Sequence, residues 1–130
     1  MTCFWDGILQ SLNNNDFNLI GVPNKPNNRQ FIQILKNKNT KTLHMRWNGK
    51  LISKNEINEN VEAINCYNAN TMNGGYMCSV SEPFLFLVSY LFKVKIIHRY
   101  CGRDMIYEPN CTHRKTLYYA SDRGHFWKLK

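Results

Sequence analysis

The sequence predicts a single α+β domain in which helices come first and a hairpin-connected sheet comes last. Up to residue 92, most apolar residues recur at helical spacing, whereas the remainder of the chain has the short apolar runs and turn residues typical of strands. A chain of 130 residues with 43% hydrophobic content is large enough for one core, and it shows no internal repeat or second domain. Helices and strands grouped in this way are typical of the α+β class.

Two helices are predicted in the N-terminal third. Apolar residues at helical spacing place the first at about Cys3–Leu12, with Thr2 as its N-cap. Gly7 weakens this helix by about 1 kcal/mol relative to alanine, and the asparagines at 13–15 end it. After a loop that contains two prolines, Asn28 opens the second helix.

Two capping boxes mark the starts of two further helices. The segment Ser53–Glu56 opens a helix over about 54–67, and Ser79–Glu82 opens another that is strongly apolar over 83–92. A polar, glycine-containing loop (68–79) lies between them. Because the last helix is apolar nearly all round, we expect it to be buried under a sheet.

Strands account for the rest of the chain. Residues 43–52 predict a strand or hairpin whose turn is Asn48-Gly49, a pair that favours the backbone twist of two-residue hairpins. The C-terminal third predicts four more strands, separated by turns at 102–104 and 121–124: 95–100, 105–107, 116–120 and 126–129.

Charge and cysteine content narrow the functional classes. The net charge is +8, which suits nucleic acid, an anionic membrane or an acidic partner, although scattered lysines without a base-reading motif are also typical of a solvated surface. Five cysteines, an odd number, argue against a disulfide framework and for a reducing compartment. The longest apolar stretch is too short to span a bilayer. We therefore expect a soluble, cytoplasmic protein with no membrane partner.

The most specific chemistry lies near the two ends of the sequence. Cys3 stands at the start of the first predicted helix, and His125 stands at the start of the last predicted strand. A helix N-terminus favours negative charge, and a neighbouring imidazolium both stabilises a thiolate and protonates a leaving group. The sequence therefore predicts a Cys–His nucleophilic pair, in which Cys3 and His125 are the catalytic residues.

Several short motifs in the same order resemble the ovarian-tumour-domain (OTU) family of cysteine proteases. The likeness covers nearly the whole chain: a cysteine followed by an apolar-aromatic pair on an amphipathic helix, a glycine loop, an acidic helix start, a following strand and a final hairpin with His-aromatic. These motifs are Cys3–Leu9, Gly74–Tyr76, Ser81-Glu82, Val94–Ile97, Thr116–Tyr119 and Gly124–Phe126. The asparagine-rich composition is similar to that of a member from a large DNA virus, the favoured source, or from a parasite.

The resemblance implies a papain-like OTU fold and a deubiquitinase activity. The catalytic helix and the helical region would pack on a small, mostly antiparallel sheet. The enzyme would be a monomer in the cytoplasm, of the host cell if the protein is viral, and would cleave after the C-terminal glycine of ubiquitin or a ubiquitin-like modifier without a cofactor. We expect the loop 68–78 to line the channel for the modifier's glycines, with Gly74, Gly75, Tyr76 and Trp127 as substrate-binding residues.

Three departures from the family pattern leave parts of the site open. Met1 and Thr2 stand where the family usually has an Asp-Gly-Asn run, so the oxyanion donors beyond the Cys3 N–H are unassigned. Many members place Asn or Asp two residues after the histidine to orient its ring, whereas this sequence has Trp127 there. A basic domain is also an unusual host for the basic tail of ubiquitin, for which Glu82 or Asp104 could compensate.

Other functions compete with this interpretation. Cys78, which precedes a predicted helix, is a rival nucleophile. A metal set with two thiolates and two imidazoles would suit tetrahedral zinc: His98, Cys101, Cys111 and His113. The leading alternative is a non-enzymatic basic module that binds nucleic acid or a host protein on a degenerate protease fold, which would require aromatic and basic side chains on one exposed face.

Overall fold

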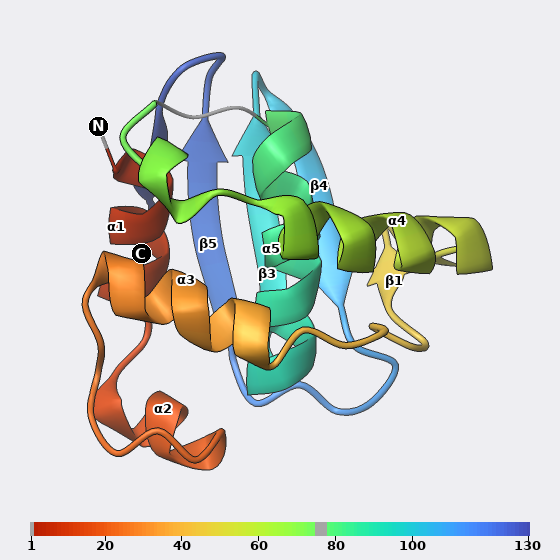
Figure 1. Cartoon of the computed structure of the whole chain (residues 1–130). Coiled ribbons are helices and arrows are strands. Elements are labelled where there is room, and N and C mark those ends of the chain that lie inside the picture. Colours follow the sequence, from red (N-terminus) through yellow and green to blue (C-terminus); the bar gives the residue numbers. More distant parts are fainter. Residues whose placement is uncertain (1, 75–77) are drawn as a thin grey trace.

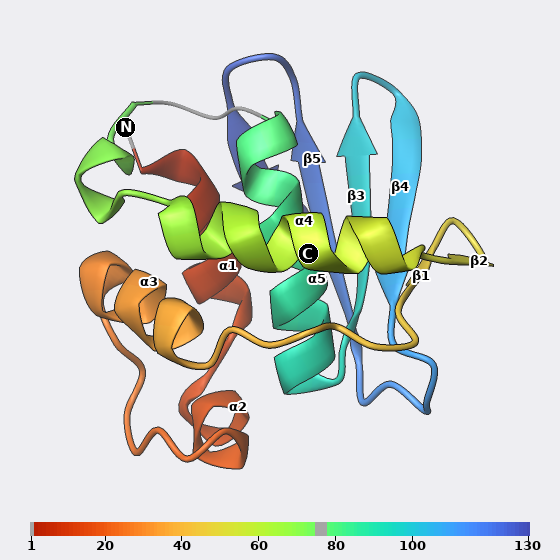
Figure 2. The same ribbon diagram turned by 45° about the vertical axis from the view of Figure 1, so that its right-hand side comes forward.

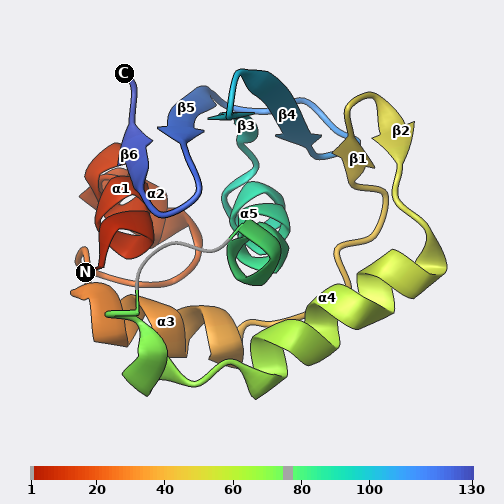
Figure 3. The same cartoon turned by 90° about the horizontal axis from the view of Figure 1, so that it is seen from above.

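A six-stranded sheet forms one side of the molecule, and the helices gather on its inner face (Figure 3). The structure, a computed structural model, describes residues 2–74 and 78–130. Its mixture of helices and a mostly antiparallel sheet confirms the predicted α+β class. Within the described residues, none of the helices is both long and apolar enough to cross a membrane.

The helices begin and end close to the predicted positions, with three exceptions. Their bounds are α1 (Cys3–Ser11), α2 (Asn14–Leu19), α3 (Asn28–Asn37), α4 (Lys54–Cys66), the 3-10 helix η1 (Ala69–Thr71) and α5 (Cys78–Phe92). The exceptions are α2, the short helix η1 inside the predicted loop 68–79, and the start of α5. The predicted capping box at Ser53 and Glu56 is present, and unpredicted ones begin α2 and α3, the latter made by Asn27 and Gln30. Periodicity accounts for α1, and periodicity together with these caps accounts for α3 and α4.

Helix α2 lies where the sequence predicts only the end of α1. Asn13 caps it, because the Asn13 side chain accepts from the Asp16 N–H while the Asp16 carboxylate accepts from the Asn13 N–H. The buried Asp16 carboxylate also accepts from Arg114 at 3.0 Å and from Lys115 at 2.7 Å. Burial raises the pKa of Asp16, but the hydrogen bonds from Lys115, Asn13 and Arg114 outweigh it, so the pKa is lowered overall. These ion pairs connect the short polar helix α2 to the loop that precedes β5 (Thr116–Ser121).

The start of α5 corrects the second predicted capping box. The helix begins at Cys78, so that Pro83 lies inside it rather than in its first turn. The Glu82 carboxylate, which the box would require, instead accepts a hydrogen bond of 2.8 Å from the Tyr107 hydroxyl on the sheet. A long-range contact therefore replaces the local cap. As predicted, α5 is buried, and it lies between the sheet and the layer formed by α3 and α4 (Figure 3).

The sheet has the strand order β2-β1-β4-β3-β5-β6 (Figures 1 and 2). Strands β3 and β5 are parallel, and the other neighbours are antiparallel. Because the β3–β4 hairpin returns the chain to the start of β3, the parallel strand β5 needs only the loop 109–115 rather than a helical crossover. The strands are β1 (Arg46–Trp47), β2 (Lys50–Leu51), β3 (Lys95–Tyr100), β4 (Arg103–Glu108), β5 (Thr116–Ser121) and β6 (Phe126–Lys128).

A buried histidine on the central strand β3 packs against the last strand, β6. His98 on β3 is fully buried, its Nε2 lies 2.6 Å from the Ser121 hydroxyl on β5, and its ring packs against Phe126 at 5.2 Å between centroids. Burial lowers the pKa of His98 from 6.5 to about 4. The imidazole is therefore neutral at neutral pH.

The depressed pKa of His98 predicts a loss of stability in mild acid. Since the unfolded chain binds the proton at the ordinary pKa and the folded chain only near pH 4, protonation favours unfolding. The free energy of unfolding should be unaffected by His98 above pH 6.5 and should fall by about 3 kcal/mol as the pH drops from 6.5 to 4. Urea unfolding across this range measures the change.

The His98→Gln variant should lose most of this pH dependence, whereas His113→Gln, at an exposed position, should keep it. An unchanged slope in His98→Gln would show that other groups cause the acid sensitivity.

Candidate active site

A cleft of about 260 Å³ lies between the start of α1 and the start of β6. It brings together the two predicted catalytic residues, Cys3 and His125, which are more than a hundred positions apart in the sequence. Trp127 lines it as well. The start of α1 and the β5–β6 turn lie at the same end of the molecule (Figures 1 and 2). The described residues that line the cleft are Thr2, Cys3, Asp6, Gly7, Gln10, His125, Phe126 and Trp127.

The floor of the cleft is an unusually close contact between α1 and β6. A Cβ atom at Gly7 would lie 3.1 Å from the Phe126 ring, closer than most side chains approach one another. Phe126 is itself buried, against Phe4 at 4.9 Å and Tyr119 at 5.0 Å between ring centroids. Gly7, which weakens the helix by propensity, therefore allows the helix to approach the strand. The Ser11 and Tyr119 hydroxyls are hydrogen-bonded at the other end of α1.

Cys3 is the first residue of α1 and is 9% exposed. Thr2 occupies the N-cap position as predicted, but its side chain accepts no hydrogen bond from the helix. Its hydroxyl instead donates to Asp6 at 2.8 Å. The Thr2 side chain therefore does not cap the first turn of α1, and the N-terminus of a helix favours a negative charge beside Cys3.

Asp6 contributes a carboxylate to the wall of the cleft. One oxygen accepts from the Thr2 hydroxyl, and the other accepts from the Asn28 side-chain amide at 2.7 Å. These bonds hold the carboxylate between the first turns of α1 and α3. No motif in the sequence points to Asp6 as a site residue, although its position one helical turn after Cys3 indicates that the two share a face.

A tight turn positions the backbone of His125. The Asp122 carboxylate accepts hydrogen bonds from the N–H groups of Gly124 at 3.0 Å and His125 at 2.9 Å, and the His125 carbonyl accepts from the Asp122 N–H. The two carboxylate bonds lower the pKa of Asp122. Aspartate is typical of such turns because its side chain bonds to the backbone two residues on.

The imidazole of His125 stacks on the indole of Trp127. The ring centroids are 5.4 Å apart, and the ring planes are inclined by 22°. Residues two apart in a strand point to the same side, which explains how the last strand can place both rings together. Trp127 is 37% exposed and thus forms an outer wall of the cleft.

The other predicted site residues lie elsewhere or outside the described residues. Gly74 is exposed and follows η1, and its N–H donates to Thr71 at 3.0 Å. Gly75 and Tyr76 lie outside the described residues. Cys78, the rival nucleophile, is the first residue of α5, and it is not among the described residues that line the cleft.

The two acidic residues expected to offset the basic charge have other partners. Glu82 accepts from Tyr107, and Asp104 pairs with Arg99 at 3.0 Å on the sheet. Asp6 is instead the acidic residue that the described part of the cleft contains.

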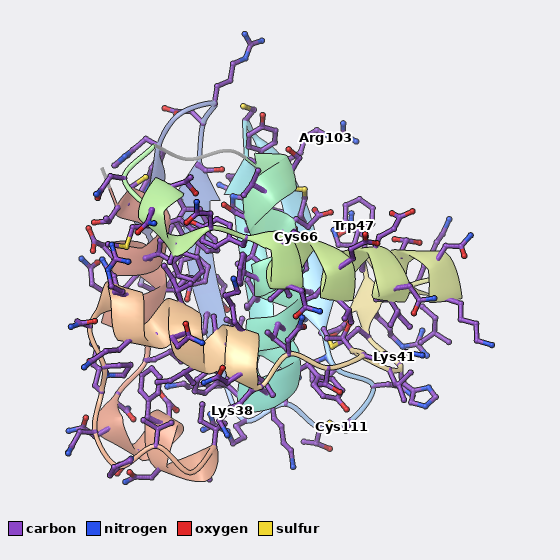
Figure 4. All side chains as sticks on the ribbon, in the orientation of Figure 1. Lys38, Lys41, Trp47, Cys66, Arg103 and Cys111 are labelled. Carbon is purple, nitrogen blue, oxygen red and sulfur yellow. The ribbon has the colours of Figure 1, made fainter. Side chains whose placement is uncertain are left out.

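The predicted zinc set is not brought together. His98 is buried in β3, whereas Cys101 in the β3–β4 turn and Cys111 in the loop before β5 are exposed. Cys111 lies at the opposite end of the sheet from Arg103, which follows that turn (Figure 4). Within residues 2–74 and 78–130, no three His, Cys, Asp or Glu side chains are close enough to share a metal ion.

Comparisons with models of protein families, with curated proteins and with solved structures found no match to this chain. The resemblance to OTU proteases therefore rests on the motifs in the sequence.

Replacing Gly7 with valine tests the contact that forms the floor of the cleft. Because valine is a slightly better helix former than glycine, propensity alone predicts a small gain in stability. The clash with the Phe126 ring predicts the opposite, a loss of about 1–3 kcal/mol in the free energy of unfolding. Urea unfolding gives the sign, and a stability equal to or above that of the wild type would contradict the close packing described above.

Proposed function

We propose that the protein is an OTU-like cysteine protease that cleaves isopeptide or peptide bonds after the C-terminal glycine of ubiquitin or a ubiquitin-like modifier. The observation that carries the proposal is the shared cleft, which is lined both by Cys3 at a helix N-terminus and by His125 next to the start of a strand. This is the combination that nucleophilic catalysis by cysteine requires. The motifs common to the chain and the OTU family supply the substrate class.

The proposed reaction has two halves. The Cys3 thiolate attacks the carbonyl carbon of the glycine, and protonated His125 donates its proton to the leaving lysine amine as the carbon–nitrogen bond breaks. A thioester between the modifier and Cys3 remains. Neutral His125 then takes a proton from water, which attacks the thioester, and the thiol and the free carboxyl group of the modifier are released.

The start of α1 offers the donors for the oxyanion. Charge that develops on the carbonyl oxygen needs N–H groups aimed at it, and the Cys3 N–H belongs to the first turn of the helix. That turn is not capped by the Thr2 side chain. The N-terminus of α1 can therefore stabilise both the thiolate and the oxyanion.

Asp6 provides a negative charge that offsets the repulsion expected between a basic domain and the basic tail of the modifier. Its carboxylate is held in the cleft wall by Thr2 and Asn28, one turn from the nucleophile. A fixed negative charge there favours the basic C-terminal tail of the modifier over an acidic peptide. Because Asp6 is exposed, we expect its contribution to depend on salt.

The nucleic-acid alternative has less support. Two cations of the central strand β3 are paired with acidic residues of β4: Lys95 with Glu108 at 4.0 Å and Arg99 with Asp104 at 3.0 Å. Lys38 and Lys41 lie apart from Arg103 (Figure 4). Salt-sensitive binding of single-stranded RNA, with no reaction towards ubiquitin probes, would favour this alternative.

A ubiquitin derivative with an electrophile at its C-terminus tests the proposal. The wild type and Cys78→Ala should form a covalent adduct, and Cys3→Ala should not, as judged by mass spectrometry. His125→Ala should slow the labelling by about a hundredfold or more, because it removes the proposed general base and acid.

Circular dichroism of each variant shows whether it is folded. Labelling that persists in Cys3→Ala but disappears in Cys78→Ala would show that Cys78, and not Cys3, is the nucleophile.

A further inference from the structure

The ring of His125 is held differently from its backbone. The Asp122 carboxylate bonds to the His125 N–H, which positions the main chain but leaves rotation of the side chain open. Among residues 2–74 and 78–130, no side chain is hydrogen-bonded to the imidazole, and its ring contact is the stack on Trp127. A catalytic imidazole must present one nitrogen to the thiol, so a restraint on its plane is required.

We propose that Trp127 is the positioning residue for His125 and replaces a hydrogen-bonding third member of the catalytic site. This inference rests on the proposed function. At 5.4 Å between centroids and 22° between planes, the indole restricts the rotation of the imidazole. The ring edge, which carries both nitrogens, is left for the thiol and for a proton acceptor.

Contacts of the neighbouring residues hold the backbone of β6 on both sides of Trp127. Phe126 on one side is buried against Phe4 and Tyr119, and on the other side the Leu129 N–H donates to the Tyr118 carbonyl at 2.9 Å. The residue opposite Trp127 on β5 is Ala120, whose small side chain leaves room for an indole to lie across the sheet. The indole therefore rests on ordered backbone although more than a third of it is exposed.

The chemistry of the indole suits a histidine that carries a charge during the reaction. The face of an indole is electron-rich and attracts a cation, and tryptophan is the strongest of the aromatic residues in this respect. A stack of this kind holds an imidazolium more firmly than a neutral ring. The contact therefore favours the thiolate–imidazolium pair, whereas an aliphatic side chain of similar bulk would only fill space.

Three variants separate stacking from bulk and from folding. Trp127→Phe keeps an aromatic face, Trp127→Leu removes it, and Leu129→Ala changes an exposed apolar residue two positions further along the chain. The readout is the pH profile of alkylation of Cys3 by iodoacetamide, followed by peptide mass spectrometry. The exposed Cys66 in the same sample is the internal reference. The shape of the profile is compared, because Cys3 is less accessible than Cys66.

A thiol with the ordinary pKa of 8.5 loses about a hundredfold in rate between pH 8.5 and pH 6. In the wild type, Leu129→Ala and Trp127→Phe, Cys3 should lose much less than Cys66. In Trp127→Leu, the loss for Cys3 should deepen by about tenfold, because the imidazolium that stabilises the thiolate is no longer held beside it. In the NMR spectrum, the upfield ring-current shift of the His125 Hε1 proton should also disappear in Trp127→Leu while the melting temperature is retained.

Two results would overturn different statements. If Cys3 is activated in the wild type and Trp127→Leu keeps both the pH profile and the His125 signal, Trp127 has no positioning role and the proposed function stands. If Cys3 of the wild type follows the profile of Cys66, the proposed function fails and the catalytic role of the stack fails with it. A persistent Hε1 shift would then identify the stack as structural.

Discussion

The packing of the Phe126 ring on Gly7 is the contact on which the candidate site depends. Gly7 is four residues from Cys3, and Phe126 is one residue from His125. An apolar contact beside the thiol and the imidazole therefore fixes the two segments that carry them relative to each other. The ring is buried among Phe4, Tyr119 and His98. Bringing together segments so distant in the sequence carries a cost in chain entropy, which burial in the common core offsets.

Polar groups below this contact make the arrangement specific. The hydrogen bond between His98 and Ser121 joins β3 to β5, and the Ser11–Tyr119 pair joins the end of α1 to β5. A buried polar pair favours the one register in which both partners are satisfied. The same strand, β5, thus orients α1 from one side and β6 from the other. Protonation of His98 in acid would disturb the layer on which Phe126 rests.

Local patterns predicted most of the fold, and long-range contacts explain the differences. Periodicity located α1 and α3, a capping box located the start of α4, and Asn48-Gly49 located the hairpin turn. Helix α2 and the first turn of α5 were missed because Asp16 pairs with Arg114 and Lys115, and because Glu82 bonds to Tyr107. Motifs predicted Cys3 and His125 as a pair. Cys3 and His125 can line one cleft because Gly7 lets α1 approach β6. In the sequence, helix propensity marks Gly7 only as a destabilising residue.

The two halves of the candidate site are therefore held by different kinds of interaction, local contacts for His125 and tertiary packing for Cys3. His125 is placed by its neighbours in the chain, since the Asp122 turn holds its backbone and Trp127 holds its ring. Cys3 is placed by tertiary packing, since α1 packs against β6 through Gly7 and Phe4 and is tied to α3 by Asp6. A change that loosens α1 should move the thiol and leave the histidine ordered. The geometry of a Cys–His pair here is thus as stable as the docking of one nine-residue helix.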